Sequence, residues 1–206
     1  MTENLERLLQ VAKEKERYEA ELEIAREIQK QLYPKSVPES AQLKLVALYK
    51  PARMVSGDYY DYRRLDDSKI AIAIGDVAGK GISAALLMAT VQSGFRSQLQ
   101  LASSSGGHSV GTSLIVSRLN EQLHANTPPE RFATFFVGVF DETTSTLHYT
   151  NAGHLPPLIL RTDGSVTRLD TANTVIGLLG GMSYTQAEIE LKPDDLFLAY
   201  SDGVSE

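Results

Sequence analysis

Three aspartates, each next to a glycine at the end of an apolar run, constrain this chain more than any other feature. They are Asp58 in VSGDYYDY, Asp76 in IAIAIGDVAGKG and Asp202 in LFLAYSDG. A carboxylate next to glycine at a strand end or tight turn lies where the backbone can come close to a ligand. The chain has no cysteine and its four histidines are scattered, so three such carboxylates predict an all-oxygen site for a hard cation such as Mg²⁺ or Mn²⁺. One Asp-Gly pair alone would be more simply explained as a turn.

Apolar and β-branched runs alternate with turn residues over most of the chain, which predicts a strand-rich domain. Strands are expected at 43–49, 69–75, 133–140, 146–151, 157–160, 166–169, 186–191 and 195–200, with hairpin-type turns at 141–144 and 162–164. Two stretches with helical periodicity, 82–101 and 110–125, interrupt the strands, and SSSGG at 103–107 indicates a flexible loop between them. Strands, two consecutive helices and then more strands favour an α+β layered fold.

The first 32 residues predict one long, charged helix, because they contain neither glycine nor proline, and Pro34 and Pro38 follow them. A heptad seam can be placed on this helix at Leu8, Val11, Lys15, Tyr18, Leu22, Ala25, Gln29 and Leu32. Six of these eight positions are apolar. We therefore expect a parallel dimeric coiled coil, the alternative being an amphipathic helix that packs on its own domain. The chain then divides into a helical linker at 1–37 and a folded domain at 38–206.

Charge and composition exclude several classes of protein. The formal net charge of −6 argues against a nucleic-acid-binding protein, since no basic stripe is present to neutralise phosphates. The lack of cysteine excludes disulfides, thiolate zinc sites and phosphatases with a cysteine nucleophile. No apolar run is long enough to cross a bilayer and the N-terminus has no signal-peptide pattern, so we expect no membrane segment and a cytoplasmic location.

The segment GDVAGKG looks like a phosphate-binding P-loop but lacks the required spacing. Gly75 and Gly79 are separated by three residues, and Lys80 is followed by Gly81 rather than by serine or threonine. A Walker-type NTPase is therefore disfavoured. In a metal site, Gly79 and Gly81 would instead let the backbone turn sharply after Asp76.

Six segments carry a resemblance to a known family: AREIQKQLYP (25–34), SGDYYDY (56–62), GDVAGKGISAALLMA (75–89), FATFFVGVFD (132–141), YTNAGHLPPLIL (149–160) and LFLAYSDGVSE (196–206). Each motif is weak alone, but their order and spacing are specific. Together they resemble the metal-dependent serine/threonine protein phosphatases of the type 2C (PPM) superfamily, in its bacterial SpoIIE/RsbU-like branch. This resemblance implies a β-sandwich flanked by helices, with a metal cleft at one end.

The resemblance also implies two divalent cations, Mn²⁺ or Mg²⁺, and assigns their ligands. Asp58 would hold metal mainly through water, Asp76 would bridge the two cations, the carbonyl of Val77 would ligate one of them, and Asp202 would hold the second. The catalytic residues would thus be Asp58 and Asp76, which act by placing the metals. Family members carry a further metal-binding aspartate beyond a later helix. Since this sequence ends at Glu206, we expect a PPM-type domain that lacks its last helix and strand.

Three further residues are candidates for binding the substrate. Arg53 lies five residues before Asp58 on the expected strand and could bind phosphate. Lys80 is a second candidate, the alternative being a solvated lysine. His154 is more simply explained as a turn histidine held by backbone groups, and the alternative is a general acid near the leaving group.

The segment GDYYDY holds a second carboxylate and two tyrosines. Asp61 could support the metal ligands from outside as a hydrogen-bond acceptor. A turn or surface carboxylate is favoured, because residues 58 and 61 of a strand face opposite sides. Tyr59 and Tyr60 are expected to pack the strand rather than to take part in chemistry.

These observations predict hydrolysis of phosphoserine or phosphothreonine on a protein, with the two cations activating water for in-line attack. By resemblance, the substrate would be a phosphorylated anti-anti-sigma (STAS-type) regulator in a partner-switching pathway, and the long helix would form a homodimer. A second hypothesis is a catalytically impaired regulatory or dimerisation module that binds a partner without turnover. A third is a metal-dependent nuclease or other phosphodiesterase, which the acidic composition disfavours.

Overall fold

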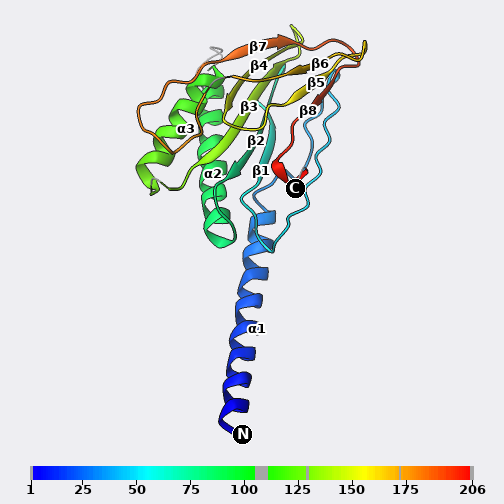
Figure 1. Cartoon of the computed structure of the whole chain (residues 1–206). Coiled ribbons are helices and arrows are strands. Elements are labelled where there is room, and N and C mark those ends of the chain that lie inside the picture. The colour runs from blue at the N-terminus through cyan, green and yellow to red at the C-terminus, as the bar shows by residue number, and fades with distance from the viewer. Residues whose placement is uncertain (1, 105–110, 129, 172, 205–206) are drawn as a thin grey trace.

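Two antiparallel sheets, two helices packed on one of them and a long N-terminal helix make up the architecture (Figure 1). The computed structural model describes the whole chain except residues 1, 105–110, 129, 172 and 205–206. The arrangement confirms the expected α+β fold.

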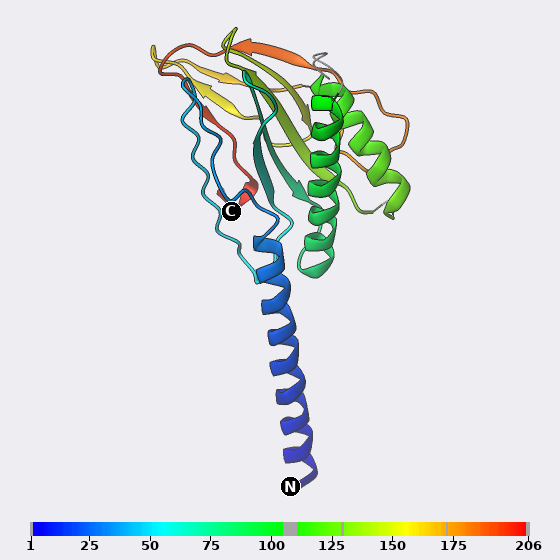
Figure 2. The same cartoon turned by 180° about the vertical axis from the view of Figure 1, so that it is seen from behind.

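The larger sheet has the strand order β1-β2-β3-β4-β7 and the smaller sheet the order β6-β5-β8. The strands of the larger sheet are β1 (Tyr59–Arg64), β2 (Lys69–Val77), β3 (Ala133–Asp141), β4 (Thr146–Ala152) and β7 (Ala187–Glu190). Those of the smaller sheet are β5 (Leu158–Leu160), β6 (Val166–Arg168) and β8 (Leu196–Leu198), and the 3-10 helix η1 (Asp202–Val204) follows β8. Helices α2 (Ile82–Ser104) and α3 (Thr112–Asn126) connect β2 to β3 and cover one face of the larger sheet (Figures 1 and 2).

Strand β3 shows why the layers form, because its side chains alternate between two hydrophobic cores. Phe135 and Val137 belong to the core beneath α2 and α3. Phe136 and Phe140 belong to the core between the two sheets, where they meet Ile159 of the smaller sheet. A strand covered on both faces is a nearly continuous apolar run, and FATFFVGVF has that composition.

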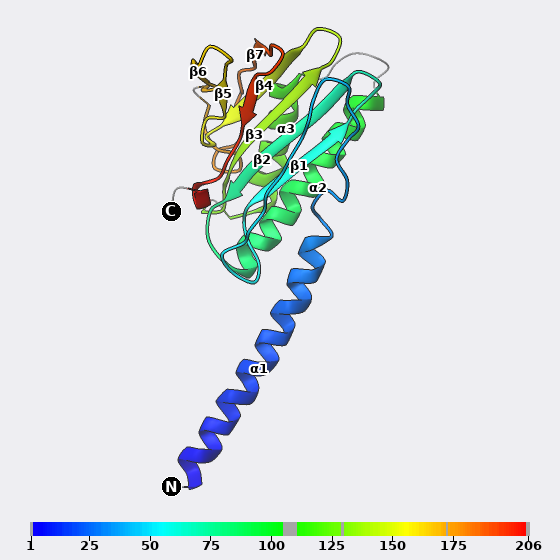
Figure 3. The ribbon, with the colours of Figure 1, turned by 90° about the vertical axis from the view of Figure 1, so that its right-hand side faces the viewer.

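Helix α1 (Thr2–Lys30) projects away from the domain, and its C-terminal end meets the domain (Figures 1 and 3). Leu8, Val11 and Tyr18 of the expected seam are each more than half exposed. Gln29 is buried, and Leu32 packs against the core beneath the helices. The long helix is therefore confirmed and its last turn packs on its own domain, while the dimeric coiled coil stays a prediction. None of the described helices combines the length and the hydropathy that a membrane span needs.

The strand expected at 43–49 is wrong, because this segment is irregular. Its two end residues, Leu43 and Tyr49, pack against the cores, while Val46 and Leu48 between them are exposed. Leu43 packs into the core between the sheets, and the ring of Tyr49 contacts those of Tyr33 and Tyr60. Strand β1, in contrast, lies outside the expected strand ranges.

The two helices of the domain begin and end close to the expected positions. Helix α2 continues to Ser104, so the first two residues of the expected loop at 103–107 are helical, and its other residues lie outside the described part of the chain. Both hairpin turns are confirmed, with positive φ angles of 54° at Ser145 and 82° at Gly164.

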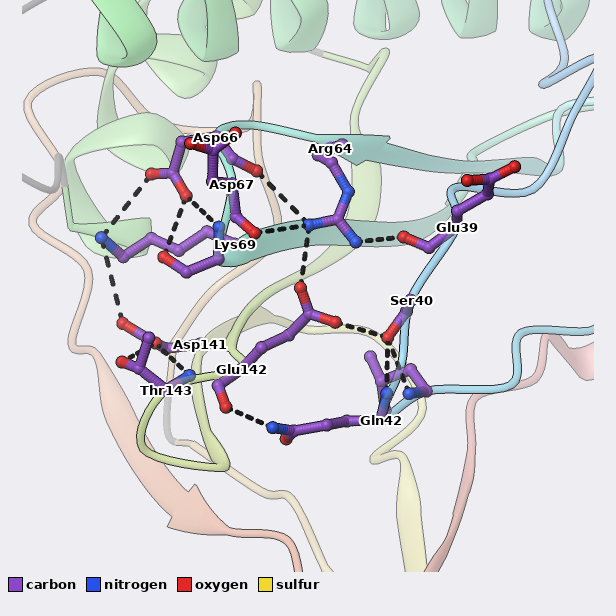
Figure 4. Close-up of polar contacts among 12 residues, drawn as sticks. Glu39, Ser40, Gln42, Arg64, Asp66, Asp67, Lys69, Asp141, Glu142 and Thr143 are labelled. Atoms are coloured by element: carbon purple, nitrogen blue, oxygen red, sulfur yellow. Dashed lines mark hydrogen bonds and ion pairs between the residues drawn. The ribbon is translucent and has the colours of Figure 1, made fainter.

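A polar network at the β3–β4 hairpin holds the chain segment that leads from α1 into the domain (Figure 4). Arg64 donates hydrogen bonds to Glu142 Oε2, at 2.8 Å, and to the carbonyl of Glu39. Ser40 donates to the other carboxylate oxygen of Glu142 at 2.5 Å, and Gln42 donates to its carbonyl at 2.6 Å. This irregular segment is therefore held by side-chain contacts.

Candidate metal centre

Three carboxylates from distant parts of the chain meet at one end of the domain. Asp58, Asp76 and Asp202 each offer one oxygen, and these oxygens all lie within 4.8 Å of one another. The strand register explains the first two, because β1 and β2 are antiparallel and Tyr59 pairs with Gly75. Asp58 just before β1 and Asp76 near the end of β2 are therefore neighbours. Asp202 reaches them from η1, directly after the smaller sheet.

Glycine at position 57 makes this convergence possible. A Cβ there would lie 3.0 Å from the carbonyl oxygen of Val77 and 3.3 Å from Oδ1 of Asp76. Gly79 and Gly81 then take φ angles of 111° and 73° as the chain leaves the site, a region that other residues rarely adopt. The sharp turn expected after Asp76 is confirmed, and the Val77 carbonyl lies close to the Asp76 carboxylate.

The donor set fits a hard divalent cation. Carboxylate and carbonyl oxygens are the ligands that Mg²⁺ and Mn²⁺ prefer in proteins. Three carboxylates this close repel one another unless positive charge lies between them. Asp58, Asp76 and Asp202 are thus the residues that would hold metal, and the Val77 carbonyl as a further ligand stays a prediction.

A cavity of about 630 Å³ opens beside these carboxylates. Asp76, Asp202, Thr134 and His154 are among the residues that line it. The hydroxyl of Thr134 accepts a hydrogen bond from the Asp76 backbone N–H at 3.2 Å and lies 2.8 Å from His154 Nδ1. Thr134, which the sequence motifs did not single out, thus links the end of β2 to the wall of the cavity.

His154 lies in a bend after β4 and contacts the Tyr200 backbone, as expected of a turn histidine, and it is also a buried residue of this wall. The Asn151 side chain pairs with both its backbone groups, accepting from the N–H at 2.8 Å and donating to the carbonyl at 3.0 Å. Burial lowers the pKa of His154 to about 4, against opposing effects of the Tyr200 backbone, Asp58 and Asp202. The ring is therefore neutral at pH 7, which disfavours it as a general acid.

The two cationic candidates from the sequence lie elsewhere. Arg53 is exposed in an irregular segment, so its expected place on a strand is wrong. Lys80 is also exposed, and neither residue lines the cavity. Within the described part of the chain, Arg168 of β6 is the one arginine or lysine that does. No sequence motif marks Arg168, since it lies on a three-residue strand far from the three aspartates in sequence.

Asp61 is neither a surface carboxylate, as was favoured, nor part of the metal cluster. It is 2% exposed, accepts from Arg96 Nε at 2.7 Å and accepts from the Tyr59 hydroxyl at 2.8 Å. Arg96 also donates to the carbonyl of Leu32 at 3.0 Å. The pair therefore ties β1, α2 and the end of the N-terminal helical segment together. The expected packing role of Tyr59 is confirmed.

A short series of hydrogen bonds connects α1 to the Asp58 carboxylate. The buried amide of Gln29 donates to the Ser56 carbonyl at 2.8 Å and accepts from the Ser56 N–H at 3.0 Å. The Ser56 hydroxyl in turn donates to Asp58 Oδ2 at 3.0 Å. Tyr33 adds a hydrogen bond of 2.7 Å to the Asp58 carbonyl. These contacts fix the orientation of Asp58.

Gln29→Ala is expected to weaken Mn²⁺ binding by about tenfold, the lower end of what is seen when the partner of a metal ligand is lost. Isothermal titration calorimetry with Mn²⁺ measures this change. Gln10→Ala is the matched control, because it makes the same substitution on an exposed part of the same helix, where the Gln10 side chain donates to Glu14. Equal Mn²⁺ affinities for the Gln29 and Gln10 variants would contradict this role of Gln29.

Comparison with known proteins agrees with the geometry. The family model of stage II sporulation protein E (SpoIIE) matches residues 66–206. Protein IcfG of Synechocystis is 32% identical over 90% of this chain and 32% of its own length. Phosphoserine phosphatase RsbU of Bacillus subtilis is 31% identical over 91% of this chain and 54% of its own length. This chain spans about half or less of the length of these two relatives.

Solved structures show the same arrangement. The RsbU and RsbW domains of a Mycobacterium tuberculosis protein match with a TM-score of 0.61 and 28% identity, over 77% of this chain and 42% of that one. The SiaA-PP2C domain of Pseudomonas aeruginosa matches with a TM-score of 0.72 and 21% identity, over 89% and 71%. RsbX in complex with magnesium matches with a TM-score of 0.57 and 16% identity, over 73% and 68%. These last two show likeness of fold alone.

Proposed function

Because this chain belongs to the SpoIIE family of PP2C-type phosphatases, we propose that it hydrolyses phosphoserine or phosphothreonine on a protein, using two divalent cations, Mn²⁺ or Mg²⁺. The observation that carries the proposal is the convergence of Asp58, Asp76 and Asp202, whose oxygens lie within 4.8 Å of one another. Two relatives named as phosphoserine phosphatases, RsbU and RsbP of Bacillus subtilis, support the reaction class.

Divalent cations, when bound, supply the charge that neutralises phosphoryl oxygens and lowers the pKa of water. The protein's contribution is to position the metal-binding side chains. Asp76 is held in the β2–β3 ladder, where its backbone N–H donates to the Thr134 hydroxyl. Ser56 and Tyr33 orient Asp58. No side chain is needed as a covalent nucleophile, and the cavity beside the carboxylates gives the phosphorylated segment its place.

The finer assignments rest on analogy with the family. We propose a STAS-type anti-anti-sigma phosphoprotein as the substrate, a cytoplasmic location, a helical linker at 1–37 and a catalytic domain from 38 onward. The exposed apolar residues Leu8, Val11 and Tyr18 of α1 support a homodimer through this helix. The net charge of −6 and the lack of a basic stripe speak against a nucleic-acid substrate.

Removal of metal is expected to abolish hydrolysis. After treatment with EDTA, the protein should hydrolyse neither a phosphoserine peptide nor p-nitrophenyl phosphate, and added Mn²⁺ should restore both activities. Phosphate release measures the rates, and calorimetry measures Mn²⁺ binding. A protein that binds no Mn²⁺ would instead be the interaction module of the second hypothesis. Cleavage of single-stranded DNA under the same conditions would favour the phosphodiesterase.

A further inference from the structure

One arginine, Arg168, lines the cavity beside the three aspartates, and its position bears on which substrates the site selects. We infer that Arg168 binds an acidic side chain that lies a few residues from the phosphoserine of the protein substrate. This inference rests on the proposed phosphatase function and adds to it the chemical class of the substrate segment.

The cavity is large enough for more than a phosphate group. Its volume of about 630 Å³ lies in the range of sites that enclose ligands of many atoms. Asp76, Asp202 and Arg168 are all among the residues that line it. The larger sheet supplies Asp76, and the smaller sheet supplies Arg168. A phosphorylated segment with its phosphate at the carboxylates can therefore place a neighbouring side chain at β6.

Arg168 is available to a ligand. Its side chain is exposed, and within the described residues it has no hydrogen bond or ion pair. Arg161 at the start of the same hairpin is different, because it is paired with the buried carboxylate of Asp195. An arginine that pairs with none of the described residues keeps its donors for a carboxylate of a partner.

Hydrogen bonds among Asn151, Thr171 and Asn173 hold part of the cavity wall together. The Thr171 hydroxyl donates to the Asn151 carbonyl at 2.9 Å and accepts from the Asn151 N–H at 3.2 Å. Asn173 donates to the same carbonyl at 3.1 Å. These bonds connect the end of β4 to the segment after β6, so they hold the backbone that follows Arg168 in place relative to β4. A well-placed backbone favours selection of one residue position in a peptide.

The charge distribution favours a carboxylate at Arg168 over the phosphate itself. The other charged residues that line the cavity within the described chain are acidic: Asp76, Asp170 and Asp202. Cations held by the aspartates would attract the phosphate, whose charge is the largest on the substrate. Arg168 then remains as the favourable place for a second, singly charged group.

Two phosphoserine peptides test the inference, one with glutamates flanking the phosphoserine and one with glutamines. The protein should prefer the acidic peptide by about tenfold in kcat/KM, the size expected for one charged hydrogen-bonded pair. Arg168→Ala should remove this preference, and Arg168→Glu should reverse it in favour of a lysine-flanked peptide. Arg118→Glu, an equal charge change at an exposed residue of α3 that does not line the cavity, should keep the preference.

Two results would overturn the inference while leaving the phosphatase function intact. One is Mn²⁺-dependent hydrolysis of p-nitrophenyl phosphate by a protein that makes no distinction between the acidic and neutral peptides. The other is a decrease in kcat/KM of Arg168→Glu that is as large for p-nitrophenyl phosphate as for the acidic peptide. Such a decrease would mean that the guanidinium contacts the phosphate. Absence of hydrolysis of any phosphate ester in Mn²⁺ would overturn the proposed function, and the inference with it.

Discussion

Asp76→Asn is expected to lower Mn²⁺-dependent kcat/KM by on the order of 10³-fold, the size seen when a group that stabilises the transition-state charge is removed. The substitution keeps the shape of the side chain but removes one negative charge from the three-carboxylate cluster. The backbone bond to Thr134 does not involve the carboxylate, so the fold is expected to remain. Hydrolysis of p-nitrophenyl phosphate over a Mn²⁺ titration measures the effect.

A second measurement separates metal binding from folding. Without metal, Asp76→Asn should be at least as stable as the wild type, because it relieves repulsion among three carboxylates. With Mn²⁺, the wild type should gain thermal stability by mass action, and the variant should gain little. Asp67→Asn is the matched control, since Asp67 is exposed at the opposite end of β2. Wild-type rates in Asp76→Asn would refute the assignment of this carboxylate.

The convergence of the three aspartates could be predicted from the sequence because each carries a local signal. A strand-like run, a carboxylate and a glycine define the chemistry at each position, and the antiparallel pairing of two such strands brings Asp58 and Asp76 together. The position of Asp202 was harder to predict, since this residue follows a strand of the smaller sheet, but the motif LFLAYSDG marks it as a candidate. Local patterns therefore suffice where one short segment contains both the backbone bend and the functional group.

Arg168 and Asp61 could not be predicted in this way, because their environments are made by distant segments. Arg168 lines the cavity only because β6 pairs with β5 in the smaller sheet. Asp61 is buried because Arg96, on α2, lies over β1. The strand expected at 43–49 was wrong for the same reason: Leu43 and Tyr49 pack against cores that distant segments build, without a neighbouring strand.

Arg96→Met is expected to destabilise the domain by about 3 kcal/mol, the lower end for breaking a buried ion pair. The side chain of Asp61 is 1% exposed and that of Arg96 28% exposed. Loss of the guanidinium therefore leaves a buried carboxylate whose donors within the described residues are the Tyr59 hydroxyl and the Tyr62 N–H. Methionine retains most of the apolar stem, so the effect reports the charge and not a cavity. Urea denaturation measures the free energy of unfolding.

The pair His148–Glu188 on the same domain provides the contrast. Glu188 is 71% exposed, and its carboxylate lies 3.2 Å from His148 Nδ1. Glu188→Ala should cost less than about 1 kcal/mol, as exposed pairs do. The double variant Asp61→Leu with Arg96→Met should recover part of the loss of Arg96→Met, since it removes the stranded carboxylate along with its partner. If Arg96→Met were no more destabilising than Glu188→Ala, the junction of β1, α2 and the end of the N-terminal helical segment would have to be held by apolar packing instead of by this ion pair.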